Sequence, residues 1–525
     1  MVAFYFMNDF RTKILNYYSL SEDDYASLTK PIEEVKLLDP DSIEGMKEVK
    51  ERIFKAIENK EKIIIYGDYD CDGITSTSIM FETFKKLNYE VSYYVPSRYI
   101  DGYGLNVENV IRIAENKFNL IICVDNGISA NEAIDKANEL GIDVIVIDHH
   151  EVPENRVKAV GIIHPTVSNI SNIIGSAGYM SLFVSAALLG YYDDYLLTLA
   201  GLSVVSDMME LKGYNRDVVR LAIDKLKKHR YPRLMDLVEN ELINEKTFGL
   251  EIAPKINAIA RVVTNKNINL LVKYLTSEDE NYVKSLRDWI LENNEQRKLL
   301  TKQAVELIPS ADLVNKSGIV LKLDILEGLI GLIANRLLGE YNVPILIFTE
   351  EEKNPDVLKG SIRSKEGFNV VKAFESLSKY IIDGGGHALA GGLSIKKADF
   401  EAFREDFEKL CATYPFDNDE KPSIEISLVD INMDNYRVLE TFSPFGVGFK
   451  EPLFKVSNLP TRGLEFISQG KHLSTPLSIQ SKLLGFNMSE SVIKSNSHID
   501  IFGTFYLNSK FRTTLEFRIS DFIAK

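Results

Sequence analysis

Four short stretches in this 525-residue chain carry the residue types that divalent cations prefer. Each follows a run of apolar residues: GDYDCDG at 67–73, VDNG at 124–127, DHH at 148–150 and VSD at 205–207. Carboxylates and imidazoles are ligands for hard to borderline divalent metals. Gathered in one place, they would suit a metal-dependent enzyme that acts on a phosphate ester.

The first stretch alternates acidic residues with other residues, so alternate side chains of an extended or tightly turning backbone can converge on one point. Gly73 would let the chain turn closely into a following helix. An acid after a strand is often only a turn or cap residue, and that is the commoner role for Asp125 taken alone. The predicted metal ligands are Asp68, Asp70, Asp72, Asp125, His149 and Asp207. The predicted catalytic residues are Asp70, Asp72, Asp125, His149, His150 and Asp207.

Carboxylates this close to one another would repel strongly, and two cations would offset that repulsion. In two-metal sites the ions lie roughly 3.5–4 Å apart and contact both the attacking and the leaving oxygen. Mixed carboxylate and imidazole ligands suit Mn²⁺, with Mg²⁺ as the alternative. We therefore expect two ions of Mn²⁺ or Mg²⁺.

A second group of residues has the chemistry to hold phosphate. The glycines before His387 would permit close backbone approach to a phosphate, and His387 could donate a hydrogen bond to it. Arg363 lies between two hydroxyl residues, which makes a reasonable phosphate clamp. A Gly-rich turn is structural about as often, and Arg261 could be an ordinary surface charge. The predicted substrate-binding residues are Arg261, Ser361, Arg363, Gly385, Gly386 and His387.

The predicted secondary structure would place the acidic stretches together. Between about residues 60 and 210, short apolar runs alternate with helix-like stretches, which is typical of a parallel sheet covered by helices on both faces. Ligands bind beyond the carboxyl ends of the strands in such sheets, and all four stretches are expected there. The predicted strands are 62–66, 91–95, 120–124, 144–147, 159–163 and 199–205, and the predicted helices are 76–86, 107–117 and 130–140.

The fold class is α/β: a parallel-sheet domain and a second α/β domain joined by a long helix, followed by a small β-barrel. The stretch 277–307 lacks Gly and Pro and predicts the long helix. Residues 318–412 predict strands, two helices and a Gly-rich turn at 384–386, and 415–422 reads as a linker. Short alternating stretches after the linker favour a barrel. The expected divisions are a helical lead-in at 1–50, a catalytic domain at 51–225, a helical linker at 226–310, a substrate-binding domain at 311–412 and an OB-fold-like domain at 423–525.

Charge and composition limit the classes of substrate and the cellular compartment that this protein could have. The net charge is −15, yet residues 453–525 carry a net +4, so the acid is concentrated in the first 452 residues. Bound cations reverse the local field, so an acidic total does not exclude a polyanionic substrate. There is no long apolar span, no secretory signal at the N-terminus and no paired cysteine pattern. We expect a cytoplasmic protein that does not contact a membrane.

The four acidic and histidine stretches resemble the four motifs of the DHH phosphoesterase superfamily. Further segments, in order from about residue 40 to about residue 455, resemble the RecJ-like single-strand-specific exonucleases of that superfamily. These segments are SRYIDGYGLN (97–106), APKINAIAR (253–261), GLIGLIANR (328–336), GSIRS (360–364), GGGHALAGG (384–392) and PFGVGFKEP (444–452).

The resemblance implies a catalytic DHH domain and a DHH-associated domain that face each other across a cleft, followed by an OB-fold. It implies 5′→3′ degradation of single-stranded DNA to 5′-mononucleotides with Mn²⁺ or Mg²⁺, in DNA repair or recombination. The resemblance assigns metal binding to the predicted metal ligands, and it assigns contacts with DNA phosphates to Arg261, Arg363 and His387. We further expect a monomer, with a helicase and a single-strand-binding protein as partners.

Two other functions remain open. One is a DHH phosphodiesterase for short oligonucleotides or cyclic dinucleotides, although such relatives generally lack an OB domain. The other is a non-catalytic replication scaffold that binds single-stranded DNA, although such relatives typically lose metal ligands that this chain keeps. Five residues depart from the usual RecJ pattern: Ile325 and Leu326 in place of a Trp-His pair, Ala260 in place of a Gly, Glu210 in place of a Pro and Phe449 in place of an Asn.

Overall fold

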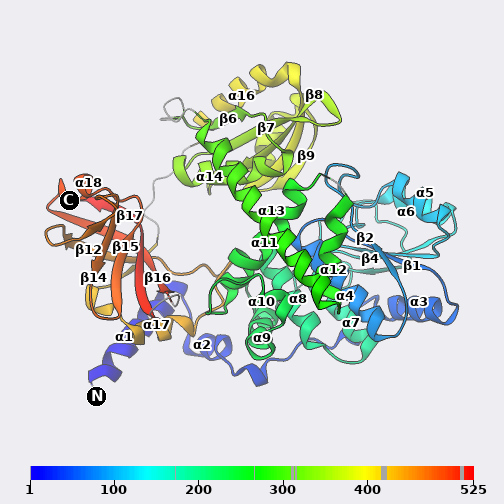
Figure 1. Cartoon of the computed structure of the whole chain (residues 1–525), viewed down its shortest axis with the longest axis horizontal. Helices are drawn as coiled ribbons and strands as arrows, with labels where there is room; N and C mark the ends of the chain where they lie inside the picture. Colours follow the sequence, from blue (N-terminus) through cyan, green and yellow to red (C-terminus); the bar gives the residue numbers. More distant parts are fainter. Residues whose placement is uncertain are drawn as a thin grey trace. The chain divides into compact units, whose positions relative to one another are not determined.

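The computed structural model describes residues 2–171, 173–264, 266–308, 313, 316–414, 422–508 and 513–525. The chain divides into two compact units (Figure 1), which are described separately. Unit 1 comprises Met1–Tyr94, Gly104–Ala253 and Glu420–Lys525, and unit 2 comprises Val95–Tyr103 and Pro254–Asp419. Most of the expected linker, residues 415–421, lies outside the described residues.

One part of unit 1, here called the parallel-sheet part, is built on a five-stranded sheet in which every strand pair is parallel. The strand order is β2-β1-β3-β4-β5. The central strands consist of Ile, Val and Leu runs that are buried on both faces, as the sequence predicts. The strands are β1 (Ile63–Tyr66), β2 (Ser92–Tyr94), β3 (Leu120–Val124), β4 (Asp143–Ile147) and β5 (Gly161–Ile163).

Helices cover both faces of this sheet (Figure 1). Helices α5 (Val107–Glu115) and α6 (Asn131–Glu139) pack against side chains of β1, β3 and β4 on one face. Helices α4 (Cys71–Lys86) and α7 (Ala177–Leu189) contact the strands from the other face. Other helices of this part include α3 (Met46–Glu58), α8 (Asp194–Ser206), α9 (Gly213–His229), α10 (Pro232–Met235) and the π-helix η3 (Thr247–Ile252).

One predicted strand is wrong. Residues 199–205 belong to helix α8, which packs between α4, α7 and α9 and is buried on nearly every side. A helix surrounded in this way has no polar stripe, so its sequence shows an unbroken apolar run like that of a buried strand. Asp207 therefore follows the C-terminus of a helix instead of a strand.

The C-terminal part of unit 1 is a seven-stranded sheet with the order β11-β12-β16-β17-β15-β14-β13. It confirms the predicted β-barrel. The strands are β11 (Ile424–Glu425), β12 (Phe454–Pro460), β13 (Phe466–Ile467), β14 (His472–Pro476), β15 (Ser481–Gly485), β16 (His498–Asn508) and β17 (Thr514–Ala524), with helices α17 (Met433–Glu440) and α18 (Glu490–Lys494).

The N-terminal helices belong structurally to this barrel. Helix α1 (Val2–Tyr18) places Phe10 and Ile14 in the barrel core, where the Phe10 ring lies 5.7 Å from that of Phe454. Helix α2 (Glu22–Leu28) follows it. The helices of the expected lead-in therefore belong to unit 1.

A buried arginine connects the helices of the parallel-sheet part to the barrel. Arg216 of α9 is 2% exposed, and its guanidinium donates to the carbonyls of Phe442, Ser443 and Pro444 at 2.7–2.9 Å. The same group lies 4.9 Å from the centre of the Phe449 ring, which also stacks on Tyr18. The Phe449 departure is thus a packing residue at this junction.

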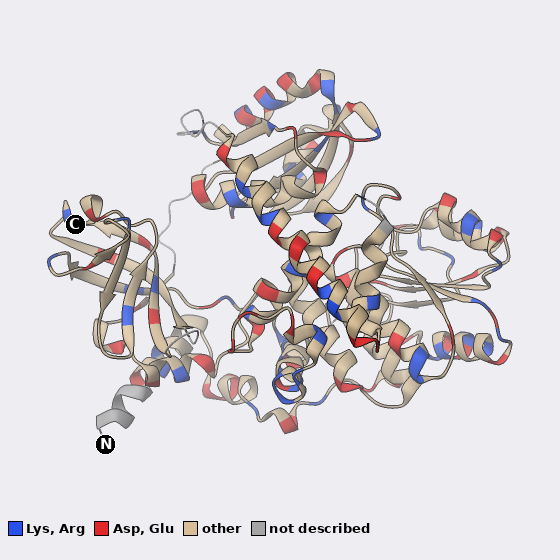
Figure 2. Ribbon diagram, viewed as in Figure 1, with Lys and Arg blue, Asp and Glu red and all other residues tan. Residues whose placement is uncertain are grey.

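Unit 2 holds a second α/β fold with the strand order β6-β7-β8-β10-β9. Its long helix, α13 (Glu280–Glu306), confirms the helix predicted at 277–307 and carries charges of both signs along its length (Figure 2). The strands are β6 (Ile319–Lys322), β7 (Ile345–Glu351), β8 (Asn354–Arg363), β9 (Ile381–His387) and β10 (Ala390–Lys396), and the other helices are α11 (Ala253–Val262), α12 (Leu270–Thr276), α14 (Glu327–Tyr341), α15 (Val370–Ser376) and α16 (Phe400–Ala412).

Two expectations about unit 2 need correction. The Gly-rich turn predicted at 384–386 is part of strand β9, at the edge of the sheet. The GSIRS segment lies at the end of strand β8, which the sequence analysis did not predict. Among the described helices, none combines the length and the apolar character needed to cross a bilayer.

Candidate metal centre

Three of the four predicted stretches meet because their strands are neighbours. Strands β1, β3 and β4 lie side by side and parallel, so Asp68, Asp125 and Asp148 leave the sheet at one edge. Asp207 reaches the same place from the C-terminus of α8. The structure therefore brings all the predicted metal ligands together within unit 1.

His149 lies at the centre of this group. Its Nε2 atom is 3.3 Å from a carboxylate oxygen of Asp125, 3.4 Å from one of Asp207 and 3.6 Å from one of Asp72. The imidazole side chain is 9% exposed, and Asp72 and Asp125 are almost fully buried. One imidazole nitrogen facing three carboxylates is a donor set that fits a divalent cation.

Asp72 is held by three hydrogen bonds from the opposite helices. The backbone N–H groups of Ala177 and Gly178, at the N-terminus of α7, each donate to one of its oxygens at 2.8 Å. The Ser203 hydroxyl of α8 donates to it at 2.5 Å. A Cβ at Gly178 would lie 2.4 Å from the Ser203 oxygen, so only glycine allows this approach. None of these supporting residues was predicted from the sequence.

Asp70 and Gly73 shape the turn into α4. One oxygen of Asp70 caps the helix by accepting from the Gly73 N–H at 3.0 Å. A Cβ at Gly73 would lie 2.4 Å from the backbone oxygen of Asp68, which explains why glycine follows the three acids. The cap leaves acceptor capacity on Asp70, because a carboxylate has about four lone-pair sites. Capping and metal binding are thus compatible here.

Asp148, the first residue of the DHH stretch, positions its two histidines. One of its oxygens accepts from the His149 N–H, the His150 N–H and the His150 Nδ1, the last at 2.7 Å. The other accepts from the Ile128 N–H at 3.0 Å. Asp148 therefore orients the ligand loop, a role that the sequence analysis did not assign.

A further histidine, His164, holds the same loop through the backbone of His150. His164 is 2% exposed, and its Nδ1 accepts from the Thr166 N–H at 3.1 Å. Its Nε2 must then carry the proton, and it donates to the His150 carbonyl at 2.7 Å. A buried histidine with both nitrogens engaged is a positioning residue for the loop.

The electrostatics of the centre favour bound cations. Burial, and then the charges of Asp72, Asp70, Asp68 and Asp207, raise the pKa of Asp125 well above its ordinary value. Burial and neighbouring carboxylates also raise the pKa of Asp72 and Asp207. For His150, burial lowers the pKa, but the hydrogen bond and charge of Asp148 outweigh this and raise it to about 9. Positive charge placed among these carboxylates would relieve their repulsion.

The ligand atoms form adjacent groups of the size that single ions need. The atoms of Asp72, His149 and Asp207 lie within 4.8 Å of one another, and so do those of Asp68, Asp70 and Asp125. Asp125 also groups with His149 and His150 by the same measure, so it links the two sets. Such an arrangement fits two neighbouring ions with a shared carboxylate.

The predicted phosphate-binding residues lie in unit 2, mostly on one face of its sheet. Arg363 and His387 both pair with Ala390 of strand β10, which lies between β8 and β9, and Ser361 and Gly385 both pair with Gly392. Directly paired residues in antiparallel strands point to the same face. Gly386 pairs with Gly391 one residue along, and so belongs to the opposite face.

Arg363 and Arg261 are partly engaged already. The Arg363 guanidinium donates to the Ser361 hydroxyl at 3.0 Å, and burial lowers its pKa. The Arg261 guanidinium donates to the Gly328 carbonyl at 3.1 Å, beside Tyr99, whose hydroxyl donates to the Arg261 carbonyl.

Leu326 occupies the N-cap position of α14, and its side chain packs partly into the core of unit 2.

Comparison with known proteins gives the chain its family. Three family models match in sequence order: the DHH family, N-terminal domain, over residues 62–226; the DHHA1 domain over 315–413; and the RecJ OB domain over 423–521. The chain belongs to the RecJ-like DHH phosphoesterases. The predicted family and α/β-plus-barrel fold class are confirmed.

Individual relatives agree with this assignment. The single-stranded-DNA-specific exonuclease RecJ of Bacillus subtilis (strain 168) is 33% identical over 492 residues, covering 90% of this chain and 62% of the relative. The chain thus spans less than two thirds of that RecJ-like protein. The solved structure of RecJ in complex with Mn²⁺ from Thermus thermophilus has a TM-score of 0.81 at 23% identity, covering 95% of this chain and 73% of that one. A structure of exonuclease RecJ bound to manganese has a TM-score of 0.61 at 25% identity, covering 71% and 96%.

Proposed function

We propose that this chain is a metal-dependent exonuclease that degrades single-stranded DNA from the 5′ end to 5′-mononucleotides. The observation that carries this is the group of Asp72, Asp125 and Asp207 around Nε2 of His149, in a chain that also has the DHHA1 and RecJ OB domains. Relatives named as single-stranded-DNA-specific exonucleases support the choice of substrate.

The metal ligands would divide into two sets. Asp72, His149 and Asp207 would hold one ion, and Asp68, Asp70 and Asp125 the other, with Asp125 close enough to reach both. Two Mn²⁺ or Mg²⁺ ions, when bound, would offset phosphate charge and bring the ionisation of water towards neutral pH. Hydrogen bonds from Ala177, Gly178 and Ser203 oppose the rise in the pKa of Asp72 that burial causes and hold its carboxylate in place, so the protein side of the site is formed before the substrate arrives.

His150 has the properties of a proton donor to the substrate. Its Nδ1 lies 2.7 Å from a carboxylate oxygen of Asp148, and although burial lowers the pKa of the ring, this hydrogen bond and the charge of Asp148 raise it. The side chain is 43% exposed, so Nε2–H is available to donate to a phosphate oxygen or to the leaving oxygen. This role fits a group beside the metal ligands better than direct metal binding does.

The DNA strand would be held by other parts of the chain. Arg363, Ser361 and His387, on one face of the unit 2 sheet, would bind its phosphates, and the glycines of β9 and β10 leave that face open to the backbone. The barrel would bind the single strand, and it carries Lys and Arg on its strands and loops (Figure 2). Arg261 would be an additional phosphate contact.

We propose that the protein acts in the cytoplasm as a monomer. Its partners would be a helicase that supplies single strands and a single-strand-binding protein. Cys71, Cys123 and Cys411 are buried, and none forms a disulfide within the described residues, which suits a reducing compartment.

The test is cleavage of DNA labelled at one end, using single and double strands with either end labelled and with Mn²⁺, Mg²⁺ or EDTA. We expect 5′-mononucleotides released from the 5′ end of single strands only, and no cleavage in EDTA. Preferential cleavage of a dinucleotide over a long strand would favour a short-oligonucleotide phosphodiesterase instead. Failure of the wild type to cleave any of these substrates would contradict the proposal.

A further inference from the structure

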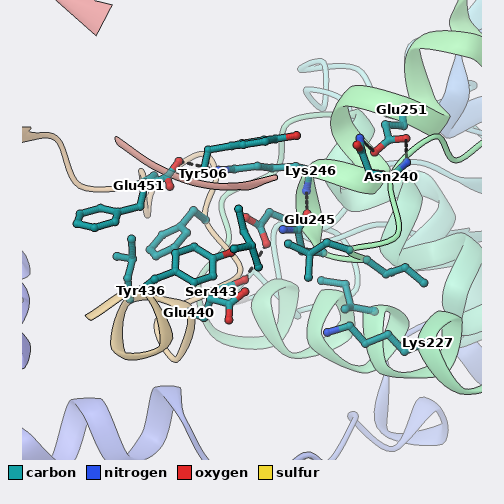
Figure 3. A pocket seen from close by; sticks show the side chains of 18 residues that line it. Lys227, Asn240, Glu245, Lys246, Glu251, Tyr436, Glu440, Ser443, Glu451 and Tyr506 are labelled. Atoms are coloured by element: carbon teal, nitrogen blue, oxygen red, sulfur yellow. Dashed lines mark hydrogen bonds and ion pairs between the residues drawn. The ribbon is translucent and has the colours of Figure 1, made fainter. Parts of the chain in front are cut away.

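A cavity of about 240 Å³ lies within unit 1, remote in sequence from the metal-ligand motifs (Figure 3). Its walls come from helix α9, the loop 240–246, helix α17 with the segment after it, and strand β16. Helix α9 and the loop 240–246 belong to the parallel-sheet part of unit 1. Helix α17, the segment after it and strand β16 belong to the barrel. The cavity therefore sits at the junction that Arg216 ties together.

The charged lining is predominantly acidic. Four glutamates and two lysines line the cavity, namely Glu245, Glu251, Glu440, Glu451, Lys227 and Lys246. Lys246 pairs with Glu451 at 2.9 Å. Glu251 is satisfied by Asn240, whose side-chain amide donates to it at 2.7 Å. These contacts account for two of the four carboxylates.

Glu245 is different because it is buried without a cation. It is 5% exposed, and the Ser443 hydroxyl donates to one of its oxygens at 2.7 Å. Within the described part of the chain, no Lys, Arg or His nitrogen lies within 4.0 Å of it, and Arg216 attracts it only from farther away. Burial raises the pKa of Glu451, and the charge of Glu245 adds to this although Lys246 opposes it. Lys246 therefore pairs with Glu451 alone, and the neighbouring Glu245 carboxylate is left without a cation of its own.

An ionised carboxylate out of water is costly unless it is paired, and one hydroxyl donor leaves most of its acceptor sites unused. The cavity beside Glu245 has room for a ligand group. Tyr436 and Phe445 also line it, and aromatic faces attract cations. A phosphate would be repelled by the same lining, so the cavity does not suit the DNA backbone.

We propose that this cavity binds the guanidinium or ammonium group of an alkyl chain, with Glu245 as the principal anion. The group could belong to a free small amine or to an Arg or Lys side chain of a partner protein. In either case the ligand would bridge the helices of the parallel-sheet part and the barrel, and binding would stabilise their junction.

The experiment is isothermal titration of the full chain in saturating Mn²⁺, so that the metal-centre carboxylates do not compete for the probe. The probes are agmatine and spermidine as free amines, and a blocked Ala-Arg-Ala peptide as the side-chain form. We expect at least one to bind and to raise the melting temperature. The preferred probe would identify the source of the cation. Binding by neither the amines nor the peptide would overturn the proposal.

Glu245→Gln should weaken binding about tenfold or more, because a charge-assisted hydrogen bond is lost, while the amide oxygen can still accept from Ser443. Glu241→Gln is the matched control: it lies exposed on the same loop, outside the cavity lining, and should bind as the wild type does. If Glu245→Gln does not fold, Leu242→Trp, which adds bulk to the cavity wall, should block binding. Unchanged affinity in the folded Glu245→Gln protein, or in Leu242→Trp where that variant replaces it, would refute the proposed site.

Discussion

Replacing Ser203 by Ala would test whether the residues behind the metal ligands set metal affinity. Ser203 is fully buried, and its hydroxyl donates to Asp72 at 2.5 Å. A hydrogen bond to a charged group contributes about 1.5–3 kcal/mol, and 1.4 kcal/mol is a tenfold change in affinity. Because Ala177 and Gly178 still donate to Asp72, we expect the lower end of this range. Mn²⁺ affinity should fall about tenfold.

The assay is calorimetric titration of Mn²⁺ into the wild type and Ser203→Ala, followed by DNA cleavage at increasing Mn²⁺. Cleavage should recover at saturating metal, because the ligand itself remains. Loss of the hydroxyl also raises the pKa of Asp72 further, so Mn²⁺ must displace a proton more often at low pH. The deficit in the variant should therefore shrink as the pH rises.

Thr198→Ala is the matched control. Thr198 is buried on the same helix, but its hydroxyl donates to the Asp194 carbonyl and not to the metal centre. Its Mn²⁺ affinity should equal that of the wild type. If Ser203→Ala bound Mn²⁺ within twofold of the wild type at every pH, the proposed support of Asp72 would be incorrect.

Three further changes test other parts of the structure. His149→Ala should abolish Mn²⁺-dependent cleavage, because it removes the imidazole that faces Asp72, Asp125 and Asp207. The circular dichroism spectrum and the affinity for single-stranded DNA should stay near those of the wild type. Turnover at the wild-type rate in this variant would exclude the ligand role. Arg363→Ala should raise KM for long single strands by about 10- to 100-fold with little change in Mn²⁺ affinity, as measured by steady-state cleavage and calorimetry, and an unchanged KM would count against the phosphate contact. Burial alone would raise the pKa of Asp500, but hydrogen bonds from Lys525, the Asn458 N–H and Lys455 hold it at about 2, below the ordinary 3.8. Asp500→Asn should therefore cost about 1–3 kcal/mol at pH 7, and in denaturant unfolding this difference should disappear as the pH falls from about 3.8 to about 2; a difference that persisted below pH 2 would contradict the charge-based explanation.

The sequence predicted the elements whose patterns are unambiguous. Runs of Ile and Val flanked by helix-like stretches identified β1, β3 and β4, and each ends at an acidic residue that the structure brings to one edge of the sheet. The metal-ligand candidates could be chosen because their residue types repeat at equivalent places. Chemistry and periodicity pointed to the same positions.

The errors have physical causes. The sequence predicts a strand at Leu199–Val205 because a helix enclosed by other helices lacks a polar stripe, and it therefore places Asp207 after a strand instead of a helix. The glycines of β9 suggested a turn, yet glycine is tolerated in an edge strand that pairs on one side only.

The supporting residues of the metal centre were not predicted because their signals are weak. Ser203 and Gly178 lie in apolar helices far from the acidic motifs, and only packing brings them to Asp72. The glycine in the first turn of α7 was the one local hint, since such a position demands a close neighbour. A single sequence does not reveal which neighbour that is.

The junction of helix α1 with the barrel has a consequence for biosynthesis. Phe10 and Ile14 remain without their apolar partners until strands β12, β16 and β17 have emerged from the ribosome. The parallel-sheet body can fold in the meantime, because its contacts are nearer in sequence. During this time the apolar side chains of helix α1 remain exposed to chaperones and to neighbouring nascent chains. Translation that stalls within the barrel should therefore yield a folded parallel-sheet body whose N-terminal helix exposes apolar side chains.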